Sequence, residues 1–139
     1  MDGSRAVPQG IGAVASALRM PSPIELEHSL VRELPDVVAR YQSAHDRSDT
    51  DAALTTFSPD AVVSDDGQAY RGHGEIRDWL ARASVEFTYT RTLIDAEALN
   101  PHTWLVTNHL EGDFPGGVVD LRYRFVLDSG LIAELEIAP

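Results

Sequence analysis

Two side chains with the chemistry of proton transfer, Tyr41 and Asp65, flank a short segment near the middle of the chain. A carboxylate in an apolar site can serve as a general base, because burial raises its affinity for a proton. A tyrosine hydroxyl can donate to an oxygen on which negative charge develops. The alternatives are a turn-forming aspartate beside Asp66 and a core tyrosine whose hydroxyl finds a buried partner. Tyr41 and Asp65 are therefore candidates for chemistry next to a carbonyl group.

Two histidines could supply a second acid or base. His45 follows Tyr41 by one helical turn, and His109 lies on an expected strand where it shares a face with Thr107 and Glu111. Each could transfer a proton or orient another group, and for each the alternative is a packed or surface histidine. No histidine pair has the spacing of a motif such as H-x-x-x-H, so we expect no metal site.

The composition excludes several classes of chemistry and of partner. The formal charge of the 139 residues is −11, and all 11 basic residues are arginine. Nucleic acids and anionic membranes need a basic face, so we expect neither as a partner. Without Lys or Cys the chain has no Schiff-base amine and no thiolate, and we expect no cofactor. The lack of Cys is consistent with a cytoplasmic location.

Helices must position Tyr41. Ser22, Pro23 and Glu25 together have the pattern of a helix start. An apolar period of 3.6 follows, and Pro35 predicts a break near Leu34. The same period then continues past Tyr41 to a turn and a second, short helix.

A strand must position Asp65. The apolar residues 61–63 predict a short strand that ends in Asp65 and a turn. A third helix is expected to start at His73 or Gly74 and to bury Trp79.

From Val85 onward the apolar period changes to two, which predicts strands joined by hairpin turns. These expected strands comprise residues 85–93, 104–112, 118–127 and 131–137. Helices first and strands last is the order of an α+β fold, with about three N-terminal helices on one face of an antiparallel sheet. We expect residues 1–21 to be a flexible tail and residues 22–139 to form a single domain with its core at about 34–138.

Three segments carry a family resemblance: ARYQSAHDRSDTDAALTTFSPDAVVSDDG, YRGHGEIRDWL and DLRYRFVLDSGLIAELEI. They resemble the SnoaL-like branch of the nuclear-transport-factor-2-like superfamily, which includes polyketide cyclases and ketosteroid isomerases. The resemblance spans about residues 34–138 and implies a cone-shaped, curved antiparallel sheet packed with helices.

The resemblance also implies roles for individual residues. In ketosteroid isomerases a helical tyrosine donates to the oxyanion and an aspartate ending the first strand moves the proton; Tyr41 and Asp65 fall on these positions. Leu121 stands where that family has a second acid. The implied function is a cofactor-free isomerase, cyclase or lyase acting on an apolar carbonyl compound. The alternative is a non-catalytic protein that binds a small ligand or acts as a dimeric accessory.

Apolar and aromatic side chains on the alternating strands and helices either line a cavity for a small apolar molecule or fill the core. The candidates for substrate binding are Phe57, Trp79, Phe87, Tyr89, Leu121, Tyr123 and Leu135. Asp120 and Arg122 alternate with the apolar set, so we expect them on an outer face of the sheet, which could hold two copies together as a homodimer.

Overall fold

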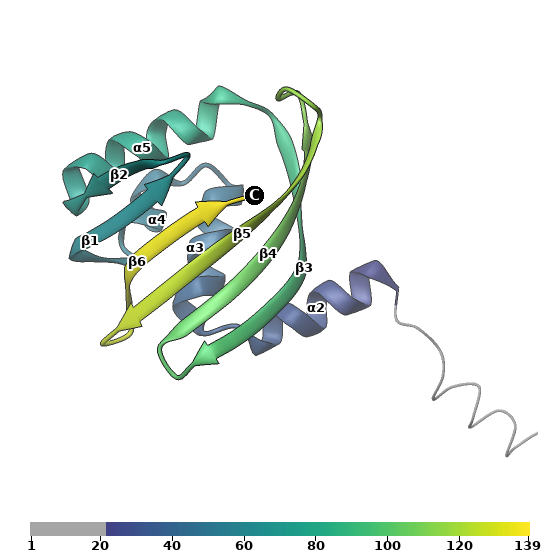
Figure 1. Ribbon diagram of the computed structural model, residues 1–139, viewed down its shortest axis with the longest axis horizontal. Coiled ribbons are helices and arrows are strands. Elements are labelled where there is room, and N and C mark those ends of the chain that lie inside the picture. Colours follow the sequence, from purple (N-terminus) through teal and green to yellow (C-terminus); the bar gives the residue numbers. More distant parts are fainter. Residues whose placement is uncertain (1–21) are drawn as a thin grey trace, which may run out of the picture.

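A computed structural model of the chain describes residues 22–139 (Figure 1). The expected tail, residues 1–21, lies outside the described residues. The elements, in chain order, are α2 (Pro23–Glu33), α3 (Asp36–Asp46), α4 (Thr50–Leu54), β1 (Phe57–Asp65), β2 (Gln68–Arg71), α5 (Gly72–Glu86), β3 (Tyr89–Asn100), β4 (Thr103–Gly112), β5 (Val118–Asp128) and β6 (Leu131–Ala138).

The helix boundaries follow local signals in the sequence. The Ser22 hydroxyl accepts from the backbone N–H of Glu25, and the Glu25 carboxylate accepts from the backbone N–H of Ser22, so α2 begins with a capping box. Pro35 separates α2 from α3, because proline cannot continue the hydrogen bonding of the preceding turn. The predicted break near Leu34 is confirmed.

The six strands form one sheet in the order β2-β1-β6-β5-β4-β3. Neighbouring strands are antiparallel except β1 and β6, which are parallel. The expected antiparallel sheet is therefore confirmed, and it contains this one parallel pair. The reason is that α5 carries the chain from one side of the sheet to its far edge, and the later hairpins lead back until β6 reaches β1 (Figure 1).

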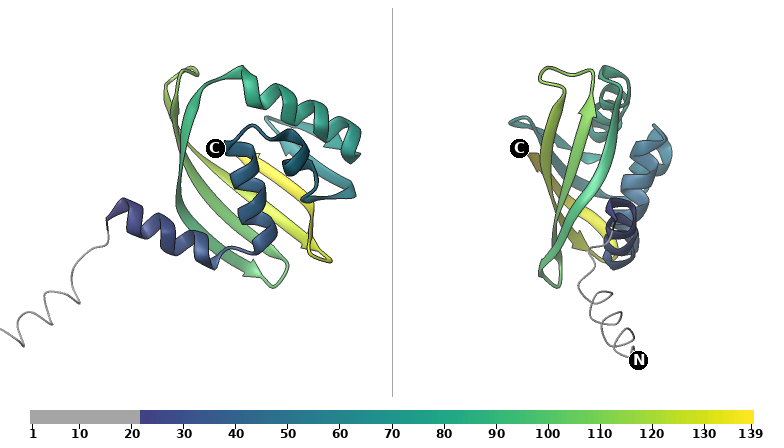
Figure 2. Two further views of the ribbon diagram at one scale, coloured as in Figure 1. Left: turned by 180° about the vertical axis from the view of Figure 1, so that it is seen from behind. Right: turned by 90° about the vertical axis from the view of Figure 1, so that its right-hand side faces the viewer.

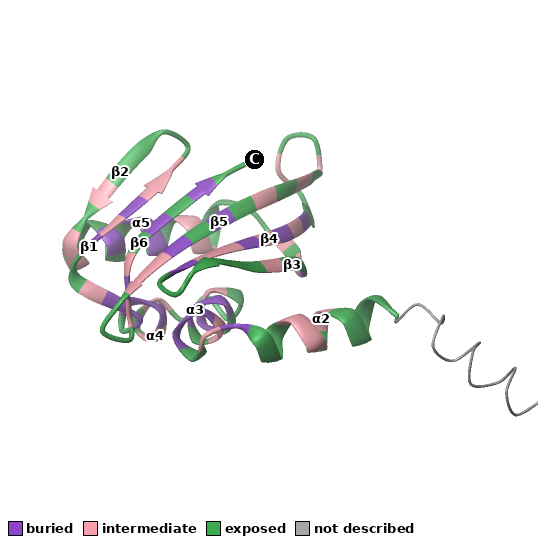
Figure 3. Ribbon diagram, turned by 60° about the horizontal axis from the view of Figure 1, so that its bottom comes forward, coloured by how far each residue is buried: buried purple, intermediate pink, exposed green. Residues whose placement is uncertain are grey.

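The sheet curves around the helices, and α3, α4 and α5 lie on its concave side (Figure 2). The core fills the space between, and the faces of α3 that are buried point toward the sheet (Figure 3). Helix α2 lies beside β3 and has no buried residue. This is the predicted α+β cone. Among residues 22–139 no helix is long and apolar enough to cross a membrane.

Alternation along β5 matches the expectation for that strand. Tyr123 and Phe125 are buried, whereas Asp120, Arg122 and Arg124 are exposed on the convex face. The side chains of a strand alternate between its two faces. The faces of β5 therefore also show which side chains of the paired strands β4 and β6 lie on the concave side. The predicted outward position of Asp120 and Arg122 is confirmed.

The start of β3 differs from the prediction. Helix α5 continues through Glu86, Val85 is 80% exposed, and β3 begins only at Tyr89. The Asp113 carboxylate accepts from the backbone N–H of Thr88, which fixes the chain just before the strand. Val85 and Glu86, expected in the strand, are therefore the end of a helix, and Phe87 and Thr88 connect it to β3. A short alternating run also fits one helical face.

Candidate active site

A pocket of about 780 Å³ opens between α5, the turn after β1 and the concave face of the sheet. Seven of the residues predicted for catalysis or substrate binding line it: His45, Asp65, Trp79, Phe87, Tyr89, Leu121 and Tyr123. They come from a helix, a strand end, a second helix and two further strands. The fold thus brings together residues that are far apart in the sequence.

Asp65 is half-buried at the end of β1. Asp66 and Gly67 both have positive φ, 52° and 76°, as the two-residue turn between β1 and β2 requires. The indole Nε1–H of Trp79 donates to Asp65 Oδ2 at 3.0 Å. No side chain or backbone group of residues 22–139 donates to the other carboxylate oxygen, which is available to a substrate.

The position of Trp79 is fixed by an aromatic contact with β2. Its ring stacks on Tyr70 with 6.1 Å between centroids. The Arg82 guanidinium lies 5.4 Å above the Tyr70 ring and donates to the Tyr70 hydroxyl at 3.1 Å. Trp79 is 4% exposed, and this stack on one face of its ring helps to fix the direction from which the indole approaches Asp65.

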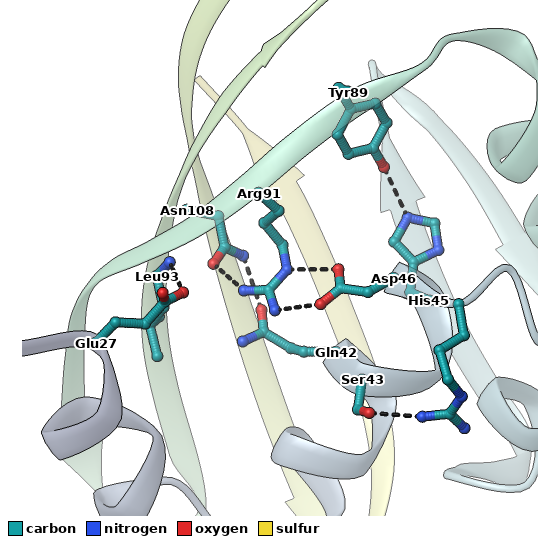
Figure 4. Close-up of polar contacts among 10 residues, drawn as sticks. Glu27, Gln42, Ser43, His45, Asp46, Tyr89, Arg91, Leu93 and Asn108 are labelled. Carbon is teal, nitrogen blue, oxygen red and sulfur yellow. Dashed lines mark hydrogen bonds and ion pairs between the residues drawn. The ribbon is translucent and has the colours of Figure 1, made fainter. Parts of the chain in front are cut away.

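His45 and Tyr89 meet across the pocket, with 3.0 Å between His45 Nε2 and the Tyr89 hydroxyl (Figure 4). Burial lowers the pKa of His45 below its usual value, so the imidazole is neutral at pH 7. Burial, followed by the charge of Asp46, raises the pKa of Tyr89. The pair is therefore a neutral hydrogen bond in which the imidazole tautomer decides which group donates.

Tyr41 lies behind the pocket and not on its surface. Its side chain is 1% exposed, stacks on His45 and meets the edges of Phe57 and Phe125. Its hydroxyl has no hydrogen-bond partner among the described residues. Burial, and then the neighbouring Tyr123 and Tyr89 hydroxyls, raise the pKa of Tyr41, so it remains a protonated donor.

Tyr123 lines the pocket directly. Its side chain is 4% exposed, and its hydroxyl makes no hydrogen bond within residues 22–139. Burial raises the pKa of Tyr123 as well. The concave side of the cone therefore holds two protonated phenols without partners, one on the pocket surface and one beneath it.

An ion pair behind the pocket was missed by sequence reasoning. Arg91 donates to both carboxylate oxygens of Asp46 at 2.8 and 2.6 Å and to Asn108 Oδ1 at 2.8 Å (Figure 4). Asn108 in turn donates to Gln42 Oε1 at 2.7 Å. These contacts fasten α3, which carries Tyr41 and His45, to β3 and β4. The signal was present, since Arg91 alternates in phase with the apolar residues of its strand.

Besides Tyr41, three predicted residues do not line the pocket. Phe57 and Leu135 are each 1% exposed and belong to the core, because they face the helices below the pocket floor. His109 lies on the convex face, where Nδ1 is 2.6 Å from Asp120 and Nε2 is 2.8 Å from Glu111. Side chains of one strand alternate between faces, so His109 cannot join a site lined by Leu110. The structure therefore does not bring His109 together with Asp65 and His45.

The pocket also contains residues that were not predicted. Asp66 and Glu86 line its polar side, and Leu110, Phe114 and Val119 line its apolar side. Leu110 and Val119 could have been found from alternation, since they are in phase with Asn108 and Tyr123. Phe114 lies in a turn rich in glycine, where no period exists to indicate its direction.

Within residues 22–139 no three His, Asp or Glu side chains are arranged to hold a metal ion. The groups of the pocket that could do chemistry are the Asp65 carboxylate with one free oxygen, the free phenol of Tyr123 and the neutral imidazole of His45, with the Tyr41 phenol beneath them. Together they can move a proton at carbon and donate to an oxygen on a ligand.

Comparison with known proteins identifies the family. The model of the SnoaL-like domain matches residues 38–135. A provisionally assigned polyketide cyclase from Sinorhizobium meliloti is 37% identical, with a TM-score of 0.73 over 78% of this chain and 98% of that one. No curated protein matches.

Two more distant structures share the fold. A protein from Catenulispora acidiphila with a ketosteroid isomerase-like fold, in complex with trimethylamine, is 18% identical with a TM-score of 0.67, over 76% of this chain and 85% of that one. RV0760c from Mycobacterium tuberculosis, in complex with estradiol-17β-hemisuccinate, is 15% identical with a TM-score of 0.63, over 74% of this chain and 90% of that one. The sequence match, the cone and its pocket together place this chain in the SnoaL-like domain family, with a nuclear-transport-factor-2-like fold.

Proposed function

We propose that this protein binds a small apolar carbonyl compound and catalyses its isomerisation, cyclisation or cleavage without a cofactor, with Asp65 as the general base. One observation supports this most strongly: Asp65 lies in a largely apolar pocket with one oxygen held by Trp79 and the other free. A base is effective when its position is fixed and its lone pair faces the substrate.

In this reaction the free Asp65 oxygen takes a proton from the carbon next to the carbonyl group. Charge then develops on the carbonyl oxygen, which needs a hydrogen-bond donor. The phenols of Tyr123 and Tyr41 are the donors without partners on this side of the cone. Tyr123 lines the pocket and would contact the substrate oxygen, with Tyr41 behind it. Leu121 beside them supplies no acid, so the tyrosines would act alone.

Two related structures fit the same class of ligand. The Sinorhizobium meliloti relative has a provisional polyketide cyclase assignment, and RV0760c binds a steroid derivative. Phe87, Phe114 and Leu121 give the pocket of this chain a surface suited to such apolar bodies.

Proton exchange into a simple ketone provides the test. In heavy water the protein should accelerate deuterium incorporation next to the carbonyl of β-tetralone, as followed by proton NMR. Asp65→Asn should lower this rate by about 100-fold or more, because the amide cannot accept the proton. Asp60→Asn, an exposed aspartate on the same strand, should leave it unchanged. Equal rates for Asp65→Asn and the unmodified protein, both folded by circular dichroism, would refute the proposal.

The second candidate function is ligand binding without turnover. It is favoured by the position of Tyr41, whose hydroxyl does not reach the pocket surface. Binding of β-tetralone without acceleration of exchange would support this function over the catalytic one.

A further inference from the structure

The charges of the pocket all have one sign. Asp65, Asp66 and Glu86 line it, and no arginine does. The sequence has no lysine. The one basic group on the lining, His45, is kept neutral because burial lowers its pKa. A ligand in this pocket therefore meets negative charge alone.

None of these three carboxylates is neutralised by an ion pair with another described residue. Arg82 lines a neighbouring hollow that shares all three, but its guanidinium lies over the Tyr70 ring. Arg91 lies beyond His45 and Tyr89 and is occupied by Asp46. The negative charge of the pocket is thus available to a ligand.

An aromatic group lies on the other side of the same pocket. Phe114 meets Phe87 and Tyr89 edge to face, with 6.1 and 6.5 Å between centroids. Phe87 is 37% exposed although it is a large apolar side chain. These residues lie where the turn between β4 and β5 approaches the connection from α5 to β3 (Figure 1). Aromatic faces attract cations, and most strongly where water is partly excluded.

A further observation indicates a ligand and not merely an acidic surface. Tyr123 is 4% exposed and lines the pocket, yet its hydroxyl has no partner within residues 22–139. A phenol hydroxyl that no protein group occupies can donate to an acceptor atom of a ligand in the pocket. The pocket therefore offers a hydrogen-bond donor at its inner end to a ligand that carries an acceptor there.

We propose that the ligand carries a positively charged amine, protonated or quaternary, at the end opposite this acceptor. The ammonium lies between Asp66 and Glu86 on one side and Phe87 and Phe114 on the other. The apolar body extends toward Leu121, and the carbonyl oxygen toward Tyr123. This inference rests on the proposed function in that Asp65 acts on the same ligand. Carboxylates and phosphate esters are disfavoured by the same charges.

Three probes with one phenyl-ethyl body test the charge preference: phenethylamine, phenethyl alcohol and hydrocinnamate. Their affinities, measured by NMR titration at constant ionic strength, should decrease in that order. Phenethylamine should bind at least about fivefold more tightly than the alcohol, because it adds a cation–π contact and a partly screened ion pair. Added salt should weaken the binding of phenethylamine alone.

Variants test which residues of the pocket cause the preference for phenethylamine. The double variant Asp66→Asn/Glu86→Gln should weaken phenethylamine binding by about tenfold and change the affinity for the alcohol by less than about twofold. Phe87→Leu, which keeps an apolar side chain, should weaken phenethylamine binding by about threefold. Glu97→Gln, an exposed acid on β3 outside the pocket, controls for net charge.

The outcomes separate this inference from the catalytic one. Equal affinity for the three probes, or tighter binding of hydrocinnamate, refutes the amine preference and leaves deuterium exchange at Asp65 as its own question. Preference for phenethylamine together with unchanged exchange in Asp65→Asn keeps the amine and refutes the general base. Failure of phenethylamine to bind at millimolar concentration also refutes the amine preference, and exchange into β-tetralone alone then decides on Asp65.

Discussion

Two histidines of this chain have opposite environments. His45 is half-buried against Tyr41 and Tyr89, and this burial lowers its pKa. His109 lies on the surface between Asp120 and Glu111, which accept its hydrogen bonds and raise its pKa. Their titrations therefore contribute to stability with opposite signs.

The sign for His109 gives a test by pH. A pKa above the usual 6.5 means that the folded protein binds this proton more tightly than the unfolded chain. The stabilisation is fully present below the unfolded pKa and is lost as the pH rises through the folded one. His109→Gln should therefore lower the urea midpoint more at about pH 5 than at about pH 9.

His102→Gln is the matched control for this comparison, since His102 lies exposed in the turn between β3 and β4. Its effect should be small at both pH values. An effect of His109→Gln that is equal at the two pH values would show that the carboxylates do not hold the proton.

Residue types and spacing predicted Asp65, His45 and the tyrosines on the concave side, because helix and strand periods fix the side on which a residue lies. His109 was predicted from its residue type, but its strand places it on the convex face, away from the other candidates. Thr107 and Glu111, in phase with it, already indicated the polar side. The exact depth of Tyr41 could not be predicted, since it depends on how closely α3 packs against Phe57 and Phe125.

At the scale of elements, the hydrogen bonds of Arg91 hold α3 against β3 and β4. Arg91→Leu should destabilise the protein by about 2–4 kcal/mol, because Asp46 and Asn108 lose their charged partner in a partly buried place. Arg40→Leu is the control: Arg40 pairs with Asp36 along the same helix, but both side chains are more than half exposed, so the cost should stay below about 0.5 kcal/mol.

Chemical denaturation measures both changes. Similar costs for Arg91→Leu and Arg40→Leu would mean that α3 is held by apolar packing alone. A selective loss in Arg91→Leu would also be accompanied by changes in the NMR signals of His45, which is on the same helix.

Gly112 permits the close approach that forms the upper wall of the pocket. A Cβ at this position would lie 2.5 Å from Tyr89 Cβ and would also overlap the Thr88 carbonyl. Gly112→Ala should therefore destabilise by about 2 kcal/mol or more and shift the start of β3, with Phe87 and Tyr89.

Gly74→Ala provides the contrast, because an added Cβ in α5 meets no atom within 4 Å. It should leave the protein equally stable or about 0.5–1 kcal/mol more stable, since alanine favours a helix. Thermal unfolding compares the two variants. A tolerated Gly112→Ala would contradict the close packing of β3 and β4 at this end.

Strands with a long alternating apolar pattern and turn residues at both ends were predicted well. Strands β4, β5 and β6 begin and end within a residue of the expected positions, because glycine, proline and aspartate mark their turns. The boundary between α5 and β3 was missed, since Val85 and Phe87 fit either period. The parallel pairing of β1 with β6 is a long-range property, and no local pattern encodes it.

For the whole molecule, we propose pairing of two copies through the convex face of the sheet. Arg122, Arg124, Glu134 and Glu136 are exposed on adjacent strands of this face and form no ion pair within the described residues. A two-fold axis would bring each charge to an opposite one on the partner.

Light scattering at micromolar concentration should give twice the mass of one chain. Arg122→Glu/Arg124→Glu should shift the mass to that of one chain, because the face then carries charge of one sign. A single-chain mass for the unmodified protein would refute the pairing.

The β1–β6 pair also has a consequence for folding. Ile137 of β6 lies opposite Asp65 of β1. In the sequence, however, four other strands and α5 lie between these two strands. During synthesis β1 emerges long before β6 and must wait with an unpaired edge. Contacts between distant segments form slowly, so Asp65 gains its final neighbour late. The pocket that Asp65 lines should therefore form only together with global folding.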